Sequence, residues 1–208
     1  MAKQQNQSMI SETSICNQAL SWLGHDRIDS LDQPISTAEW CRDNYQFLRD
    51  AVLEEHMWTF ATVRASSGPV TETAEHGGYF VHNIPLGWLK VFRVFRDANG
   101  NALDEWYLEG RQILSRCDTI YMWGIERVTD TGRFTNMFVQ CLAHRMAADM
   151  AIPLTANENL AQMYYQKYLK CLDDAAARDG QQSSNEQLRH RRLVPARSGR
   201  RGYGLRGY

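Results

Sequence analysis

The 208-residue sequence predicts an α+β fold, in which a bundle of about four helices is interrupted by one antiparallel β region. Two observations lead to this prediction. Apolar residues recur at helical spacing in 11–57 and again in 133–179. Between them, 58–128 contains short segments rich in Val, Ile, Phe, Tyr and Trp, which Gly, Pro and Asn separate as they do strands and turns. We expect 1–10 to be flexible and 180–208 to form a linker and an extended C-terminal arm.

The first helix is expected over 11–23, because its apolar residues fall on one helical face. These residues are Ile15, Ala19, Leu20 and Leu23. Ser11 is a candidate N-cap. Gly24 stands in the C′ position, where glycine commonly ends a helix.

The second helix is expected from Ser36 to about His56, because Ser36 and Glu39 match a capping box. Four apolar residues then follow at i, i+4, i+7 and i+11 of one helical face. They are Cys41, Tyr45, Leu48 and Val52.

The β region is expected to form short strands from the stretches TFATVRA, GYFVHNI, LKVFRVFR, EWYLEG, RQILS and TIYMWGIE. Asn99-Gly100 is the strongest hairpin signal, because both residues readily adopt the positive φ of a tight turn. This signal predicts that the segments on its two sides form a hairpin.

The third helix is expected to begin near Phe134 and to be closed by Pro153, since proline cannot continue a helix. Its apolar stripe comprises Phe134, Met137, Phe138, Cys141 and Leu142. The fourth helix is expected to begin with a second capping box, formed by Thr155 and Glu158.

The fourth helix is expected to run to about Arg178 and to be stopped by Gly180. Its apolar stripe comprises Leu160, Tyr164, Tyr168, Leu172 and Ala175.

The composition is that of a folded protein without a membrane anchor. No window approaches the roughly twenty apolar residues that a membrane span needs. The polar N-terminus MAKQQNQSMISE lacks the apolar core of a signal peptide, so we expect the protein to stay in the cytoplasm where it is made. The five cysteines are odd in number, widely spaced and without a CxxC pair, which predicts reduced thiols.

Charge is distributed unevenly along the chain. Seven arginines and no Asp or Glu lie between Leu188 and Tyr208, whereas the whole chain has a net charge of -1. Without these arginines the rest of the chain carries about -8, so an acidic body is joined to a basic arm.

Motifs for catalysis, cofactors and metals are weak or absent in the sequence. Gly202, Gly204 and Gly207 spell GxGxxG, but no strand precedes them and no helix follows. The histidines form no HxxxH pair, and His76 and His82 have no thiolate or carboxylate at ligand spacing. We therefore predict no enzymatic activity, no cofactor and no metal site.

Five stretches together resemble one known family. They are CNQALSWLG, RIDSLDQPISTAEWCRDNYQFLRDAVLEEHMWTFA, GYFVHNIPLGWLKVFRV, YLEGRQILS and FTNMFVQCLAHRMAADMAIPLT. The family is that of the head-to-tail adaptor (connector) proteins of short-tailed bacteriophages, the tail tubular protein A family. The resemblance covers about 10–179 and is most recognisable from Cys41 to Ala61; these are structural positions, so they imply no chemistry.

The resemblance implies a virion protein at the portal vertex, synthesised in the cytoplasm of the host bacterium. Its relatives form rings, typically of twelve copies, that bind the portal protein on one side and the tail nozzle protein on the other. Genomic DNA would pass through the ring without sequence-specific binding, and tail fibres would be a further partner. We expect 69–78 and 97–104 to make the contacts with nozzle and fibres, because they are polar turns in the β region.

In the relatives the C-terminal segment reaches the portal. We assign portal binding to the arm here on its position and composition, because arginine can bind carboxylates bidentately and tyrosine anchors interfaces. The assigned residues are Arg189, Arg191, Arg192, Arg197, Arg200, Arg201, Tyr203, Leu205, Arg206 and Tyr208.

Three alternatives remain open from the sequence. The arm segment RRGYGLRGY could bind single-stranded nucleic acid through charge and stacking. The arm could instead be dispensable. The β region could belong to a cell-wall hydrolase that uses Asp104, Glu105 and Glu109, which lie along one predicted hairpin arm.

Overall fold

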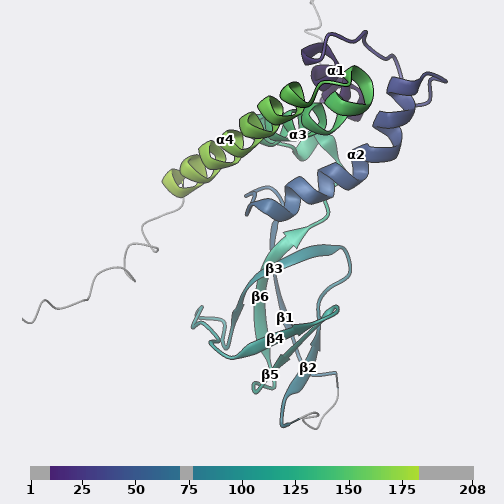
Figure 1. The fold of residues 1–208 in the computed structure, drawn as a ribbon. Coiled ribbons are helices and arrows are strands. Elements are labelled where there is room, and N and C mark those ends of the chain that lie inside the picture. Colours follow the sequence, from purple (N-terminus) through teal and green to yellow (C-terminus); the bar gives the residue numbers. More distant parts are fainter. Residues whose placement is uncertain (1–9, 71–76, 183–208) are drawn as a thin grey trace, which may run out of the picture.

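The structure is a computed structural model that describes 10–70 and 77–182, with side chains described as far as Arg178. Helices α1, α2, α3 and α4 form a helical body, and six strands form a β region beside it (Figure 1). The chain enters the β region from α2 and returns to the helical body through a 3₁₀ turn, Thr131–Arg133. The predicted α+β class is confirmed.

Helix α1 (Glu12–Trp22) begins and ends as its sequence predicts. The Ser11 hydroxyl accepts a hydrogen bond from the Ser14 N–H at 3.1 Å, which satisfies one of the free donors of the first turn. Gly24 follows with a φ of 77°, a conformation that glycine adopts without steric cost.

Helix α2 (Ser36–Glu55) contains the predicted apolar stripe, but its predicted capping box is wrong. Ser36 is the first residue of the helix, and the N-cap is Ile35, which makes no side-chain cap hydrogen bond. The backbone is still extended at Ile35, with a φ of -132°, and turns helical one residue later than a Ser36 cap requires. The position of the cap was therefore set by the approach of the preceding loop.

The six strands form two three-stranded antiparallel sheets instead of one β region. The first sheet has the order β1-β6-β3, from strands β1 (Thr62–Ser67), β6 (Ile120–Glu126) and β3 (Trp88–Phe95). The second has the order β2-β5-β4, from strands β2 (Phe80–Asn83), β5 (Gln112–Ser115) and β4 (Trp106–Glu109).

The Asn99-Gly100 signal marks a turn whose two arms separate after a short distance. Gly100 has a φ of 84°, and the Arg96 N–H donates to the Asn101 carbonyl at 2.9 Å. Only an isolated bridge between Phe95 and Ala102 extends this pairing. Strand β3 then pairs with β6, and β4 pairs with β5, so the predicted hairpin is confirmed only for the residues next to the turn and is wrong for the rest of the two flanking segments.

Helix α3 (Asn136–Thr155) differs from its prediction at both ends. Thr135 is the N-cap and accepts from the Phe138 N–H at 3.3 Å, so Phe134 precedes the helix. Pro153 lies inside the last turn and does not close the helix, which ends at Thr155 and is followed by Ala156 with a left-handed φ of 52°. Proline is tolerated there because it removes only one backbone hydrogen bond near the end of the helix.

Helix α4 (Glu158–Gln182) also differs from its prediction at both ends. Thr155 belongs to α3, and the Asn157 side chain accepts from the Leu160 N–H at 3.2 Å, so the predicted Thr155 and Glu158 capping box is wrong. The helix continues through Gly180 to Gln182, because a single glycine lowers helix propensity by only about 1 kcal/mol. The predicted stop at Gly180 is therefore wrong.

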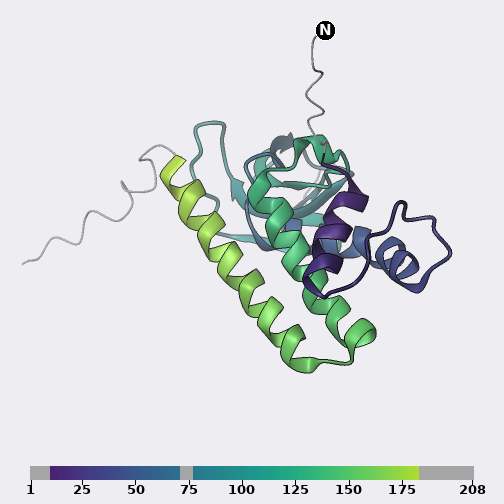
Figure 2. The same cartoon turned by 90° about the horizontal axis from the view of Figure 1, so that it is seen from above.

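Helices α3 and α4 run antiparallel and lie side by side (Figure 2). A disulfide bond joins Cys141 to Cys171 across this pair, with their Cα atoms 5.5 Å apart. The prediction of five reduced thiols is therefore wrong for these two residues. Nothing in their sequence spacing indicates the pairing, since it results from the antiparallel packing of the two helices.

The apolar core is divided in the same way as the fold. The larger cluster fills the helical body and includes Trp58, whose indole N–H donates to the Val52 carbonyl at 2.9 Å. A smaller cluster, centred on Trp88, Val94 and Met122, lies between the two sheets. Trp58 and Trp88 are thus core residues, and the candidate surfaces lie around the two clusters.

Candidate interaction surfaces

The residues assigned to portal binding lie outside the described part of the chain. They are Arg189, Arg191, Arg192, Arg197, Arg200, Arg201, Tyr203, Leu205, Arg206 and Tyr208. The contact loop expected over 69–78 is described only at its ends, since 71–76 also lie outside the described residues. The surfaces that can be built from the structure are those of the helical body and the two sheets.

One face of α4 packs on α3, and three residues of the predicted stripe are buried there together with Cys171, whereas Leu160 and Leu172 of that stripe are half-buried. Tyr164, Tyr168, Cys171 and Ala175 are all buried, at i, i+4, i+7 and i+11. Burial raises the pKa of the Tyr168 phenol, and the nearby Glu55 carboxylate adds to this shift. This face fixes α4 to the helical body and leaves the rest of the helix exposed.

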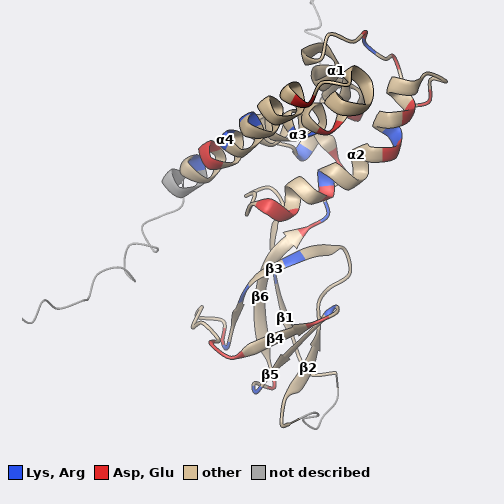
Figure 3. Cartoon of the chain, viewed as in Figure 1, with Lys and Arg blue, Asp and Glu red and all other residues tan. Residues whose placement is uncertain are grey.

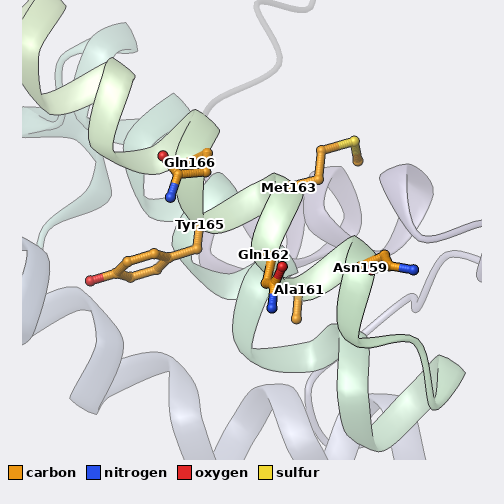
Figure 4. A pocket seen from close by; sticks show the side chains of 6 residues that line it. All are labelled: Asn159, Ala161, Gln162, Met163, Tyr165 and Gln166. Atoms are coloured by element: carbon orange, nitrogen blue, oxygen red, sulfur yellow. The ribbon is translucent and has the colours of Figure 1, made fainter.

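The outer surface of α4 exposes large apolar side chains. Met163, Tyr165 and Leu169 are 39%, 40% and 38% exposed, and the side chains of Tyr165 and Met163 leave the helix on opposite sides (Figure 4). A shallow hollow of about 490 Å³ lies here, lined by Asn159, Ala161, Gln162, Met163, Tyr165 and Gln166. None of these lining residues is charged, so this surface suits contact with another protein surface.

An ion pair on α3 borders this surface. The Arg145 Nε atom lies 3.2 Å from Asp149 Oδ2, one helical turn away. The Arg145 guanidinium carbon is also 5.5 Å and 5.6 Å from the ring centroids of Tyr165 and Tyr168. The side chains of both helices are thus held in place beside the exposed Tyr165 ring.

On another side of the α3–α4 pair, aromatic rings join these helices to α1. The Trp22 ring stacks on His144 with centroids 4.3 Å apart, and the Tyr164 hydroxyl donates to the Trp22 carbonyl at 2.8 Å. Burial lowers the pKa of His144, and the charge of Lys167 lowers it further. This cluster is a structural contact in which a neutral imidazole is favoured.

Charged residues, blue and red in Figure 3, join the helical body to the β region. Asp50 Oδ1 accepts from Arg49 Nε and Nη2 at 2.9 Å and 2.8 Å, and Asp50 Oδ2 accepts from Arg127 Nε at 2.7 Å. The Arg49 side chain is only 4% exposed, whereas that of Arg127 is 51% exposed. Glu12 and Thr129 help to line a hollow of about 350 Å³ beside these residues.

Sequence reasoning missed this junction. Asp50 and Arg127 are separated by 77 positions, so no local spacing could bring them together. Arg49 is buried, although arginine is usually exposed on a helix surface. The signal available was a basic residue next to the apolar stripe, and this is too common to indicate an ion pair.

His82 and Ser115 form a pair that superficially resembles a nucleophile and its base. His82 Nε2 lies 3.1 Å from Ser115 Oγ and 3.0 Å from the Cys117 carbonyl oxygen. Both side chains are fully buried between the sheets, and the other ring nitrogen of His82 has no hydrogen-bond partner. Without access for a substrate this pair stabilises the β region by satisfying buried polar groups.

The carboxylates considered for hydrolysis lie on and just before β4. Asp104, Glu105 and Glu109 are all exposed. Glu105 accepts a hydrogen bond from the Tyr79 hydroxyl and lies 3.7 Å from Arg116 Nε. Neither of the hollows above includes any of these carboxylates.

The turn that contains Asn99-Gly100 is held in shape by one carboxylate. Asp97 accepts from the Asn99 and Asn101 backbone N–H groups at 3.0 Å and 3.2 Å, and from the Asn101 side chain at 2.6 Å. The hydrogen bond from the Asn101 side chain, with those from the backbone, keeps the pKa of Asp97 below its ordinary value. The expected contact loop over 97–104 thus begins with a preformed turn.

Two kinds of site have no candidate in the described residues. Among the described residues, no group of three His, Cys, Asp or Glu side chains could hold a metal ion. None of the described helices is both long and apolar enough to cross a membrane.

Comparisons of the chain with models of known protein families and with curated proteins found no match.

Proposed function

We propose that this protein is a structural virion protein, a ring-forming head-to-tail adaptor that joins the portal to the tail nozzle around the DNA channel. The sequence resemblance to the adaptors of short-tailed bacteriophages supports this proposal. The observation that carries it is the exposure of large apolar side chains on α4: Tyr165 and Leu169 lie one helical turn apart, and Met163 is exposed on the opposite side of the helix. Such side chains are favoured at contacts between proteins.

Exposed apolar side chains also occur on α2, which supports contacts between copies. Phe47 is 70% exposed, and Ile35, just before the helix, is 46% exposed. A protein that uses two different surfaces to contact its neighbours forms head-to-tail contacts, and these close into a ring when the rotation between copies allows it.

The arm provides the contact with the portal in this proposal. The 26 residues that follow Gln182 have a maximum extended length of roughly 90 Å, enough to run along the flank of a partner. Their arginines carry the opposite charge to the body of the chain and can bind carboxylates bidentately. The portal surface that receives the arm is therefore expected to be rich in Asp and Glu.

The proposal is tested by native mass measurements on the protein alone and mixed with its cognate portal. The full chain and a truncation that ends at Asn185 are compared. We expect the full chain to join the portal in a fixed multiple near twelve and the truncation to remain unbound. If neither chain associates with the portal, the proposed function is wrong; if both associate equally, the arm is not the portal-binding segment.

A matched variant separates charge from geometry. Replacing all seven arginines of the arm by lysine keeps the charge but removes the planar fork of the guanidinium group. We expect this variant to bind the portal more weakly than the full chain and more tightly than the truncation. If instead the full chain binds single-stranded DNA with an affinity that falls steeply with salt, while portal association is insensitive to the arm, the arm binds nucleic acid.

A further inference from the structure

The two sheets of the β region turn their outer faces in opposite directions. Val94 and Met122 of the first sheet pack in one cluster with Ile113 and Trp106 of the second. Because successive side chains of a strand point to opposite faces of a sheet, the side chains between these positions point outward on the two sides of the β region. The outer face of the first sheet and the edge strand β4 of the second sheet differ in charge.

The outer face of the first sheet carries two arginines and two aromatic rings. Arg64 on β1 and Arg93 on β3 both lie opposite Trp123 of the central strand β6, and Tyr121 lies two residues away on the same face. We call Arg64, Arg93, Tyr121 and Trp123 the arginine face. Both arginines are exposed, and neither forms an ion pair with any described residue.

The arginine face is partly preorganised. The Arg64 guanidinium carbon lies 4.0 Å from the centroid of the Trp123 ring, and the Phe95 ring contacts the same Trp123 with centroids 5.0 Å apart. A guanidinium held flat on a ring keeps its N–H groups free at the edge to bind a carboxylate. Since Arg64 and Phe95 already occupy the Trp123 ring, a stacked nucleobase suits this face less well than a carboxylate does.

The second sheet ends in an exposed strand of opposite charge. Tyr107 and Leu108 on β4 are 51% and 56% exposed, and Asp104 and Glu109 flank them. Neither of these carboxylates forms an ion pair with a described residue. We call Asp104, Tyr107, Leu108 and Glu109 the carboxylate strand. Within the described part of the chain β4 pairs only with β5, so its other edge is open.

We propose that the arginine face of one copy binds the carboxylate strand of the next copy. Each surface has charges without partners in the single chain, the charges are opposite, and both surfaces have exposed or half-buried aromatic rings. Because one surface is the outer face of the first sheet and the other is the edge strand of the second sheet, a copy can use both surfaces at once. The contact repeats from copy to copy, as a ring requires. This inference rests on the proposed ring and names one of its contacts.

Charge reversal on each surface tests the contact. One variant carries Arg64→Glu and Arg93→Glu, and the other carries Asp104→Lys and Glu109→Lys. Each variant places like charges at every contact, and we expect each alone to lose about 100-fold or more in affinity between copies. In an equal mixture of the two variants every contact can again join opposite charges, so assembly is expected to return.

The measurement is native mass with the cognate portal present, together with thermal unfolding of each variant. A control with Arg27→Glu and Arg178→Glu makes the same change in net charge at exposed positions of the helical body outside α2, and is expected to assemble normally. Restoration in the mixture shows that the variants fold, since misfolded chains could not rescue each other. If a variant shows a lowered melting temperature, the milder pair Arg64→Gln and Arg93→Gln is used, with reduced assembly expected.

Three results would overturn the proposed contact. In the first, the glutamate variant of the arginine face assembles as well as the unmodified chain. The ring then forms without this contact, and the proposed contact is wrong. In the second, both variants fail to assemble and the mixture fails too. In the third, the glutamate variant assembles normally but loses salt-dependent binding to single-stranded DNA, which would assign the arginine face to nucleic acid. Failure of the unmodified chain to assemble would instead overturn the proposed function itself.

Discussion

The helical body and the β region depend on cores of very different size. Among the residues that the structure describes, thirty buried apolar residues form the cluster of the helical body, whereas five form the cluster between the sheets. Burial of apolar surface contributes about 25 cal/mol per Å², so the helical body accounts for most of the apolar stabilisation. The β region gains additional order from polar contacts, such as those of His82 and Asp97. The helical body is therefore expected to be the more stable region, and the β region, with its exposed edges and turns, the less stable one.

Hydrogen exchange measures this difference directly. We expect the backbone amides of the central helix α3 to exchange more slowly than those of the edge strands β2 and β4. Equal protection in the two regions would show that they unfold as a single cooperative unit.

The largest effect is expected from breaking the core of the helical body. Phe138 is fully buried, with its ring centroid 5.1 Å from those of Trp58 and Phe60. Phe138→Ala should lower the free energy of unfolding by about 3 to 5 kcal/mol, because it leaves a cavity among these rings. Urea unfolding gives this value. Phe47→Ala, at a 70% exposed position, should change it by less than about 0.5 kcal/mol, and a comparable loss at both positions would contradict the assigned core.

The next effect is expected at the junction of the two regions. Asp50→Asn leaves the nearly buried Arg49 without its counter-charge and should cost about 3 kcal/mol. Asp43→Asn is the matched control, since Asp43 also pairs with a neighbouring arginine on α2 but is 66% exposed; its expected cost is under about 1 kcal/mol. Chemical denaturation of both variants tests the difference. Equal costs would show that burial of Arg49 is not what gives Asp50 its importance.

A smaller effect, confined to the β region, is expected at Gly124 on β6. A Cβ atom there would lie 2.5 Å from Trp88 Cε3 and would also clash with the Lys90 carbonyl. Gly124→Ala should therefore lower the free energy of unfolding by about 1 to 3 kcal/mol, because the sheet must shift to admit one methyl group. Gly68→Ala is the control, since a Cβ atom there meets nothing within 4 Å. Hydrogen exchange should locate the Gly124→Ala effect in the β region, and a uniform loss over α1 and α3 would contradict this.

The smallest effect on stability is expected from a change in pH. The pKa of His144 lies below its ordinary value of 6.5, mainly because of burial and also because of Lys167. The stability that the neutral imidazole contributes is present above the ordinary pKa and is lost as the pH falls through that value towards the folded pKa. The melting temperature should therefore fall as the pH is lowered from 7 to 5. This range begins about half a unit above the ordinary pKa and ends more than one unit below it. His144→Phe should make this fall smaller, and an unchanged pH profile would exclude His144 as its source.

The sequence predicted the helices and strands that depend on a local pattern of residues. The stripe from Tyr164 to Ala175 follows from 3.6 residues per turn, and the structure confirms its burial. The strand stretches were likewise recognised from their β-branched and aromatic residues. These signals need only a few neighbouring residues, so they can be read without knowledge of the tertiary structure.

What the sequence could not predict depends on contacts between distant segments. Thr62 pairs with Ile125 in the first sheet, and no local pattern indicates such a pairing or the division into two sheets. The disulfide between Cys141 and Cys171 has the same origin. Helix ends were also misplaced, because the start of α2 at Ser36 is set by the extended backbone of the preceding residue. Of the candidate surfaces, only the contact loop over 97–104 was anticipated among the described residues, and its role as a contact stays a prediction.

The length of α4 has a consequence for how the arms act together. With Cys141 opposite Cys171, the first residue of α3 lies level with about residue 176 of α4, so the last turns of α4 to Gln182 extend roughly 10 Å past the end of α3. In a ring, each arm would start from such an overhang, and all arms would be held at a high effective concentration over one partner. Once the first arm has bound, each further binding step is intramolecular, so the avidity of the whole ring can exceed the affinity of one arm by about 10²-fold or more. Individually weak arms are then sufficient for a lasting joint.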